Sequence, residues 1–260
     1  MKNSININSL ILGLLILFQS CVSKKDILYL QDLDSNKSME LFYVPSTLQV
    51  DDILDITVET LVPEASIPYN KNISGFRQIN NIEVMKLEGY LVSSNKTINF
   101  PVLGAISVDG KTTKTLEEDL KKYLESGGYL IDPTITVRLI NAKVTILGEV
   151  KTPGTFTFTE NNITFLQALG LAGDLNINGN REDIILIRTT DGLQTAAHIN
   201  LTNSEWLSGP FTNIQPNDVI VVNPNGSKIK SAAFFGNASS FVAIASLLIS
   251  TAVLINNINN

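Results

Sequence analysis

Few side chains in the sequence have a type and spacing that could do chemistry. Asp51 and Asp52 are adjacent acids that could bind a metal ion or transfer protons. A similar stretch downstream keeps the second acid as Asp218 but has Asn217 in place of the first. We therefore favour a structural turn, in which the aspartate side chain accepts backbone N–H groups before a strand. His198 is the only histidine, so we expect a surface or packing residue there and not a metal ligand or base.

Other candidates for an active site are equally sparse. A glycan-active enzyme would need a carboxylate pair, or a nucleophile with a base, whereas the acids of this chain are scattered in predicted turns. Trp206 lies beside Leu207 and Phe211 and is interpreted as a packing residue, with a sugar-stacking aromatic as the alternative. The sequence therefore predicts no catalytic residue, no metal and no cofactor.

Composition bounds the class of protein. The chain has 260 residues, is 44% hydrophobic and carries a net charge of −6, which allows one or two modest domains. Its lysines and arginines are not clustered. Because neutralising phosphates requires basic residues gathered on one face, we exclude nucleic acid as a partner.

The N-terminus has the order of a bacterial lipoprotein signal. A basic start precedes an apolar run at 10–18 that is too short to span a bilayer, and Ser20 then precedes Cys21, the only cysteine. We predict that residues 1–20 are a signal peptide and that Cys21 becomes the lipidated N-terminus, since acyl chains anchor a protein when enough methylenes are buried. An ordinary secreted protein with a free cysteine is the alternative. The polar residues 21–41 are predicted to be a tether.

The elements that follow repeat a strand–turn–strand–helix pattern. Residues 98–108 alternate apolar and polar side chains around a turn at Gly104, which predicts a half-buried hairpin. Thr115 begins a Ser/Thr-x-x-Glu capping box, and leucines recur every four residues until Gly127 ends the predicted helix. The alternation in residues 134–139 predicts a further strand.

A second copy of the pattern begins at the strand predicted for residues 144–150. In the turn after it, Pro153 fixes φ and Gly154 is expected to supply a positive φ. Asn162 is the expected cap of a helix that ends near Gly173. Two ββα units in tandem predict an α+β protein of small modules with mixed sheets, not a βαβ dinucleotide-binding fold.

Two later stretches continue the strand pattern. Residues 184–188 and 196–201 flank Asp191 and Gly192, which predicts a hairpin. The run 214–222 contains Asp218 and predicts a turn that leads into a strand.

The C-terminal segment, residues 231–256, has the length and pattern of a membrane helix. Ala232 to Ile255 contains 24 residues without a charge, about 36 Å of helix, which is enough to cross a hydrocarbon core of about 30 Å. At about 100° per residue, its polar positions form a narrow stripe opposite a broad apolar face. We interpret it as a transmembrane amphipathic helix whose stripe lines a water-filled lumen; a simple second anchor and close packing of helices through small residues are the alternatives. The stripe consists of Ser239, Ser246, Ser250 and Asn257, opposite Phe241, Leu248 and Ile255.

Two of these stretches resemble a known family. Residues 89–92 with 98–104 resemble the end of the polysaccharide export domain. Residues 144–154 resemble the start of an SLBB domain, the β-grasp module that follows it in outer-membrane polysaccharide export lipoproteins. The resemblance implies a polysaccharide export domain at 42–141 and an SLBB domain at 142–224.

The resemblance also implies a function. Such proteins are lipid-anchored in the outer membrane with folded domains in the periplasm, and their C-terminal helices form an α-helical barrel in a homo-oligomeric ring. The expected activity is passive conduction of a capsular polysaccharide or exopolysaccharide. The expected partners are further copies of the chain, the polysaccharide, outer-membrane lipid, and an inner-membrane copolymerase that is often a tyrosine kinase. Two other classes stay open: a periplasmic or surface assembly lipoprotein without a pore, and a glycan-active lipoprotein enzyme.

Overall fold

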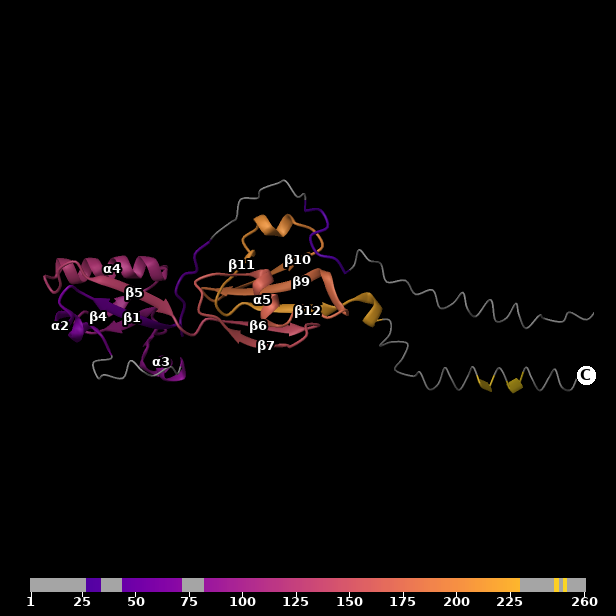
Figure 1. The fold of residues 1–260 in the computed structure, drawn as a ribbon, viewed down its shortest axis with the longest axis horizontal. Coiled ribbons are helices and arrows are strands. Elements are labelled where there is room, and N and C mark those ends of the chain that lie inside the picture. Colours follow the sequence, from indigo (N-terminus) through magenta and orange to yellow (C-terminus); the bar gives the residue numbers. More distant parts are fainter. Residues whose placement is uncertain (1–26, 34–43, 72–81, 230–245, 248–249, 252–260) are drawn as a thin grey trace, which may run out of the picture.

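The computed structural model describes residues 27–33, 44–71, 82–229, 246–247 and 250–251. These residues form two domains that follow one another along the long axis of the molecule (Figure 1). Each domain has a buried apolar core of its own. The α+β class expected from the sequence is confirmed, and both predicted hairpin–helix units are present.

The first domain combines a three-stranded antiparallel sheet, a hairpin and one long helix. Its elements are β1 (Ile53–Glu59), α2 (Pro63–Ser66), η2 (Ile67–Tyr69), α3 (Ile82–Glu88), β2 (Tyr90–Leu91), β3 (Thr97–Phe100), β4 (Gly104–Ser107), α4 (Thr113–Ser126) and β5 (Thr134–Leu139). The sheet has the order β2-β1-β5, and β3 pairs with β4. α4 lies against β5, so the helix and the hairpin enclose the core on the sheet.

The helix α4 follows from its sequence, although it begins earlier than predicted. Leu116, Leu120 and Leu124 are all buried, as their spacing indicates. The capping residue is Thr112, whose side chain accepts the N–H of Thr115, while the Thr115 hydroxyl accepts the N–H of Thr112 at 2.8 Å. Thr115 is thus the third residue of the helix and not its cap. Its hydroxyl has the reciprocal role that a glutamate has in the predicted capping box.

The second domain is built on a five-stranded mixed sheet. Its elements are β6 (Lys143–Gly148), β7 (Gly154–Thr157), β8 (Ile163–Thr164), α5 (Phe165–Leu171), β9 (Gly179–Thr190), β10 (Leu193–Ile199), η3 (Glu205–Ser208), β11 (Asn213–Ile214) and β12 (Val219–Pro224). The strand order is β10-β9-β12-β6-β7. β12 runs parallel to β6, and every other neighbouring pair is antiparallel. α5 buries Phe165, Ala168 and Leu169 in the core.

The parallel pair β6–β12 depends on a glycine at the end of β6. Gly148 has φ +90°, and a Cβ there would lie 2.0 Å from the carbonyl oxygen of Val222. Only glycine allows this approach. Gly154, for which we predicted a positive φ, is instead an ordinary strand residue at the start of β7. The local sequence could not show that the glycine with a positive φ would be Gly148 and not Gly154, because the strand that Gly148 approaches lies far away in the sequence.

Two further local predictions shift by a few residues. The cap of α5 is Thr164, whose side chain accepts the N–H of Gln167, so Asn162 lies before the helix and does not cap it. Gly173 does follow the helix, with φ +75°. Gly104 also has a positive φ, +73°, at the turn between β3 and β4.

Most of the predicted signal peptide, tether and C-terminal helix lies outside the described residues. Of the tether, residues 27–33 are described, and they dock on the second domain instead of standing free. Of the C-terminal segment, only 246–247 and 250–251 are described. No helix within the described ranges has the length and apolar character needed to cross a membrane.

Candidate functional site

The residues first considered for chemistry do not form a catalytic or metal centre. Within the described ranges, no group of three or more His, Cys, Asp and Glu side chains could hold a metal ion. His198 lies on β10, and its Nδ1 is 2.5 Å from an Asp183 carboxylate oxygen. Both side chains are exposed, which leaves this pair on the surface of the sheet.

Asp52 closes a buried turn before β1. Its carboxylate accepts the backbone N–H of Gln49 at 2.8 Å, and its own N–H donates to the Gln49 carbonyl at 3.2 Å. Asp51 between them has φ +69°. The Asp52 side chain is thereby placed inside the first domain, with the residue only 3% exposed.

Asp218 closes the same turn before β12. Its carboxylate accepts the N–H of Gln215 at 2.8 Å, and Asn217 has φ +68°. Asp218 also forms an ion pair, in which Arg188 on β9 donates to its two carboxylate oxygens at 3.0 and 2.7 Å. Arg188 in turn donates to two backbone carbonyls, and its guanidinium lies 5.2 Å from the ring centre of Phe211. A bidentate pair of this kind fixes β12 against β9.

The two turns therefore differ in electrostatics. Burial raises the pKa of Asp52 to about 6, and the neighbouring Asp51 carboxylate adds to the rise. Burial also raises the pKa of Asp218, but the Arg188 guanidinium opposes that effect. Asp218 is a paired carboxylate, whereas Asp52 is a buried acid that has no cation partner among the described residues.

The turn that Asp52 closes also takes part in a contact between the two domains. The tip of the β9–β10 hairpin reaches the first domain, where the N–H of Asp191 donates to the Gln49 side-chain oxygen at 3.3 Å. Lys96 lies between Asp109 and Asp191, at 2.7 and 2.5 Å from their carboxylates. These bonds hold the hairpin tip beside the turn that Asp52 closes.

Residues 27–33 cover part of the second domain. The Tyr29 hydroxyl donates to Asp174 at 2.7 Å, and the Tyr29 ring centre is 5.7 Å from the guanidinium carbon of Arg181. The N–H of Leu30 donates to the loop after β10. Burial, together with Asp174, raises the pKa of Tyr29, so the hydroxyl stays a donor. No local pattern predicts this docking, because the partners of Tyr29 lie more than a hundred residues away along the chain.

After β12 the chain leaves the second domain close to the place where residues 27–33 dock. Asn225 follows β12 directly, and its amide donates to the carbonyl of Ile177 at 2.9 Å. Lys228 forms an ion pair with Glu149, which also accepts from Asn176 at 2.9 Å. The bond from Lys228 lowers the pKa of Glu149. The residues that precede the apolar C-terminal segment are therefore held on the end of the sheet.

The residues predicted to line a pore are described only in part. Cys21, Ser239 and Asn257 lie outside the described residues. Ser246 and Ser250 are helical and exposed, and the Ser250 hydroxyl donates to the carbonyl of Leu247 at 2.9 Å. A serine that satisfies its hydroxyl within its own helix can face either water or a neighbouring helix.

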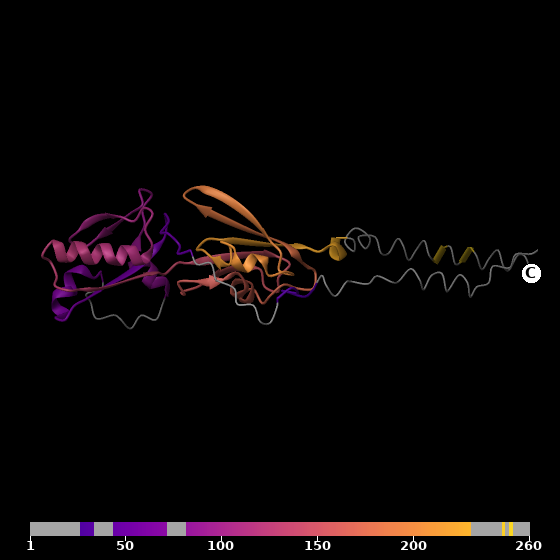
Figure 2. The same ribbon diagram turned by 90° about the horizontal axis from the view of Figure 1, so that it is seen from above.

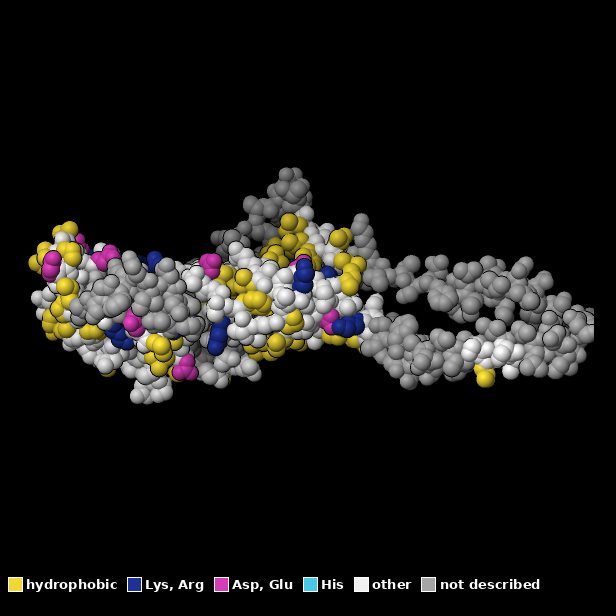
Figure 3. All heavy atoms as spheres, turned by 60° about the horizontal axis from the view of Figure 1, so that its bottom comes forward, with side chains coloured by type: hydrophobic (Ala, Val, Ile, Leu, Met, Phe, Trp, Pro, Cys, Tyr) yellow, Lys and Arg dark blue, Asp and Glu magenta, His cyan; other side chains and the backbone are white. Residues whose placement is uncertain are grey.

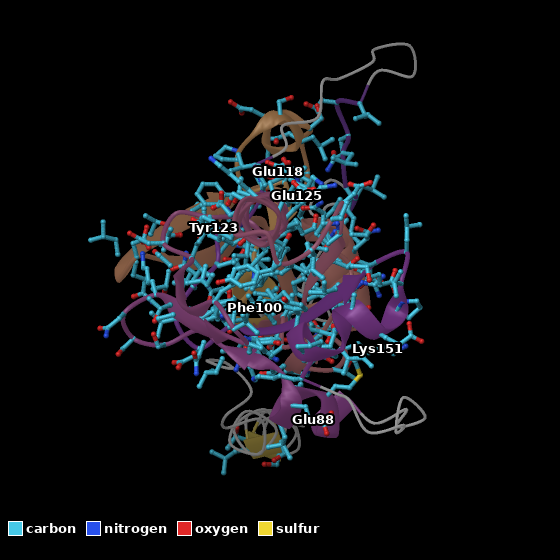
Figure 4. The ribbon with its side chains drawn as sticks, turned by 90° about the vertical axis from the view of Figure 1, so that its left-hand side faces the viewer. Glu88, Phe100, Glu118, Tyr123, Glu125 and Lys151 are labelled. Atoms are coloured by element: carbon cyan, nitrogen blue, oxygen red, sulfur yellow. The ribbon has the colours of Figure 1, made fainter. Side chains whose placement is uncertain are left out.

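A shallow hollow of about 450 Å³ lies between α4 and the β3–β4 hairpin. Leu103, Ile106 and Tyr123 form much of its wall, and none of the described residues that line it carries a carboxylate or an imidazole. Figure 4 shows Tyr123 at the side of the first domain and Phe100 within it. The hollow thus offers an aromatic and apolar surface, without the pair of acids that glycoside hydrolysis requires.

Comparison with known proteins finds two family matches in sequence order. Residues 44–140 match the model of the polysaccharide biosynthesis/export protein family. Residues 143–196 match the SLBB domain. Together the two models match more than half of the chain.

Two curated relatives are similar to the chain over part of their length. The EPS I polysaccharide export outer membrane protein of Ralstonia solanacearum is 26% identical over 189 residues, which cover 69% of this chain and 48% of the relative. The protein of the same name from Ralstonia nicotianae is 34% identical over 93 residues, or 35% of this chain and 24% of the relative. The matches thus span at most about half of these relatives.

Proposed function

The chain belongs to the polysaccharide biosynthesis/export family, and from this membership we propose that it is a subunit of an outer-membrane channel through which a capsular polysaccharide or exopolysaccharide passes passively. The family is described by polysaccharide biosynthesis and export, and both relatives are named as polysaccharide export outer membrane proteins. These names support transport, and not catalysis, as the function of the chain.

The observation that carries the proposal is where the chain enters and leaves the second domain. Pro224 at the end of β12 pairs with Gly179 at the start of β9, and Tyr29 docks beside Arg181, two residues further along β9. Both entry and exit therefore lie at the end of the second domain away from the first (Figure 1). A lipid on Cys21 and a membrane helix at 231–256 would then meet the same membrane.

This arrangement supports a direction for the molecule. The second domain would be the membrane-proximal part, and the first domain would extend into the periplasm. Copies arranged side by side in a ring would bring their C-terminal helices together, with the stripe of Ser239, Ser246, Ser250 and Asn257 facing an aqueous lumen. The polysaccharide would pass through that lumen, and the apolar faces of the helices would contact lipid.

The opposite end of the molecule is the place for an inner-membrane partner. Leu61 follows β1 and is 97% exposed, and Ile131 precedes β5 and is 91% exposed. Both loops lie at the end of the sheet away from the second domain, and hydrophobic side chains gather at that end in Figure 3. An apolar surface there suits contact with a copolymerase, often a tyrosine kinase, that hands over the polymer.

Two other functions are the competing proposals. A periplasmic or surface assembly lipoprotein would share the anchor at Cys21 but would form no pore. A glycan-active lipoprotein enzyme would need paired carboxylates in a hollow, and the hollow beside α4 has none among its lining residues. Neither alternative uses an uncharged C-terminal segment with a polar stripe.

Deletion of the gene tests the export function. A clean deletion is expected to abolish surface polysaccharide while lipid-linked precursor synthesis continues, because the chain would act after polymerisation. Complementation with the wild-type gene is the control. Surface polysaccharide at the wild-type level in the deletion strain, without a second gene of this family, would contradict the proposal, and hydrolysis of the purified polymer by the protein would favour the enzyme.

A further inference from the structure

The β10 strand forms an open edge of the second domain's sheet. It pairs with β9 from Leu193 to Ile199 on one side only. In the part of the chain that the structure describes, no strand pairs with its other side. The β9–β10 hairpin projects from the body of the domain in Figure 2, so this edge is accessible over most of its length.

The sequence of β10 does nothing to protect that edge. Natural sheets block further pairing with charged side chains, proline or a very short edge strand. β10 is seven residues long, reads LQTAAHI, and contains no lysine, acid or proline. Leu193 at its start is 74% exposed. The strand is therefore equipped to accept another strand rather than to repel one.

The same sheet carries a complementary edge on its other side. β7 is the opposite edge strand, and its four residues, GTFT, are also uncharged. Following the pairings across the sheet, β10 runs parallel to β12 and β6, whereas β7 runs opposite to them. Placed edge to edge with both sheets pointing the same way, β10 of one molecule and β7 of another are antiparallel, which is the more stable form of pairing.

We propose that β10 pairs with β7 of a second copy of this chain, so that the sheets of neighbouring subunits join. This inference rests on the proposed function, which requires a ring. The strands of the second domain run roughly along the long axis of the molecule (Figure 1). Repeated pairing of different edges is a head-to-tail contact, which forms a ring when the rotation between copies closes. Rotation about the long axis keeps every membrane-facing end on one side.

A proline substitution tests the edge without removing it. Counting from the two-residue turn at Asp191 and Gly192, the N–H of Ala196 points away from β9. Proline is tolerated at such positions of an edge strand but blocks pairing on the outer side. Ala196→Pro in the full-length, detergent-extracted protein is expected to lower the oligomer fraction at least tenfold, whereas the control Ala196→Thr keeps the N–H and assembles as the wild type does.

Cysteine pairs provide a second measurement that does not depend on a weakened fold. Ala196→Cys is combined in turn with Thr155→Cys, Phe156→Cys and Thr157→Cys on β7. Opposed residues of antiparallel strands have Cα atoms about 4.5–5.5 Å apart, within the range of a disulfide. At least one double variant is expected to give a ladder of linked subunits on a non-reducing gel, and no single variant is expected to do so.

The outcomes separate this inference from the proposed function. An oligomeric wild type, with full assembly of Ala196→Pro and no ladder from any pair, overturns the edge pairing and leaves the channel standing. Dimers from Ala196→Cys alone overturn it in favour of a symmetric β10–β10 contact, and a ladder replaced by a link to another protein overturns it in favour of a different partner. A wild type with the mass of one chain in mild detergent overturns the ring and the edge pairing together.

Discussion

At the scale of residues, Asp52 and Asp218 close the same kind of backbone turn in two different electrostatic environments. Both side chains accept the N–H of a glutamine three residues earlier at 2.8 Å. Asp218 has Arg188 as a bidentate partner, and Asp52 has no cation partner among the residues that the structure describes. A buried charge without a partner opposes folding, whereas a paired one becomes costly only when its partner is removed.

We predict opposite effects of removing the two charges. Burial raises the pKa of Asp52 to about 6 from an ordinary 3.8, so the folded chain holds this proton more tightly than the unfolded chain. The contribution of Asp52 to stability is therefore full below about pH 4 and is lost as the pH rises through 6, by about 3 kcal/mol. Asp52→Asn keeps an accepting oxygen and should be more stable than the wild type at pH 7.5 by up to that amount, with little difference at pH 4.

Asp218→Asn is the matched variant in the second turn. It keeps the turn acceptor but leaves the buried Arg188 guanidinium without a carboxylate, which should cost about 3–5 kcal/mol at pH 7.5. The cost should be smaller at pH 4, because the raised pKa of Asp218 leaves much of the wild-type carboxyl already protonated there. Thermal unfolding of the full-length protein in detergent measures both variants. If Asp52→Asn is as destabilising at pH 7.5 as Asp218→Asn, the account of Asp52 as an unpaired buried acid is wrong.

At the scale of elements, local patterns predicted the secondary structure well. The strand predicted at 134–139 coincides with β5, and the alternation in 98–108 resolves into β3 and β4. The hairpin expected around Asp191 and Gly192 is β9–β10. In each case the period of the apolar residues and the turn residues act within one element, so the sequence contains the information.

Contacts between distant segments were not predictable in the same way. The parallel pairing of β6 with β12 depends on Gly148 meeting Val222, and the docking of residues 27–33 depends on Tyr29 meeting Arg181. Neither pair shares a local pattern. Arg188 gave the one available signal, because a charge that ends an apolar strand run needs a buried partner, but its spacing of thirty residues from Asp218 does not identify which acid.

The predicted membrane helix is tested through its polar stripe. Cysteine replaces Ser246, Ser250 or Leu248 in the full-length protein, and intact cells are treated with a membrane-impermeant maleimide. Because the reactive thiolate forms poorly in hydrocarbon, the two serine positions should label at least about tenfold faster than Leu248 if the stripe faces an aqueous lumen. Cys21 does not interfere when it is acylated.

The pattern of labelling separates the competing structures for this segment. Equal protection of all three positions indicates a helix packed against protein or lipid, and equal labelling indicates a segment that does not span. Either result would remove the pore while leaving the assignment of the two domains intact, because that assignment rests on the family matches and the sheets.

At the scale of the whole molecule, the docking of residues 27–33 would limit how far the second domain can lie from the membrane when Cys21 carries the proposed lipid. Cys21 is six residues before Ile27, a reach of about 20 Å when fully extended. Glu149 and Asn225 hold the start of the C-terminal segment at the same end. With the proposed lipid on Cys21 and the proposed helix at 231–256 in one membrane, the domain would have little freedom to tilt, and the first domain should stand away from the bilayer.

This orientation predicts which surfaces approach lipid. A fluorophore on Ile177→Cys, in the loop that accepts the Asn225 amide, should be quenched by lipids with head-group quenchers in proteoliposomes of the acylated protein. A fluorophore on Ile131→Cys, at the far end of the first domain, should be quenched at least about fivefold less, since quenching requires contact with the bilayer surface. Mass spectrometry first establishes that Cys21 is acylated, and unlabelled lipids are the control. Stronger quenching at residue 131 would show that the first domain is the membrane-proximal one, and an unmodified Cys21 would remove one of the two attachments on which the orientation depends.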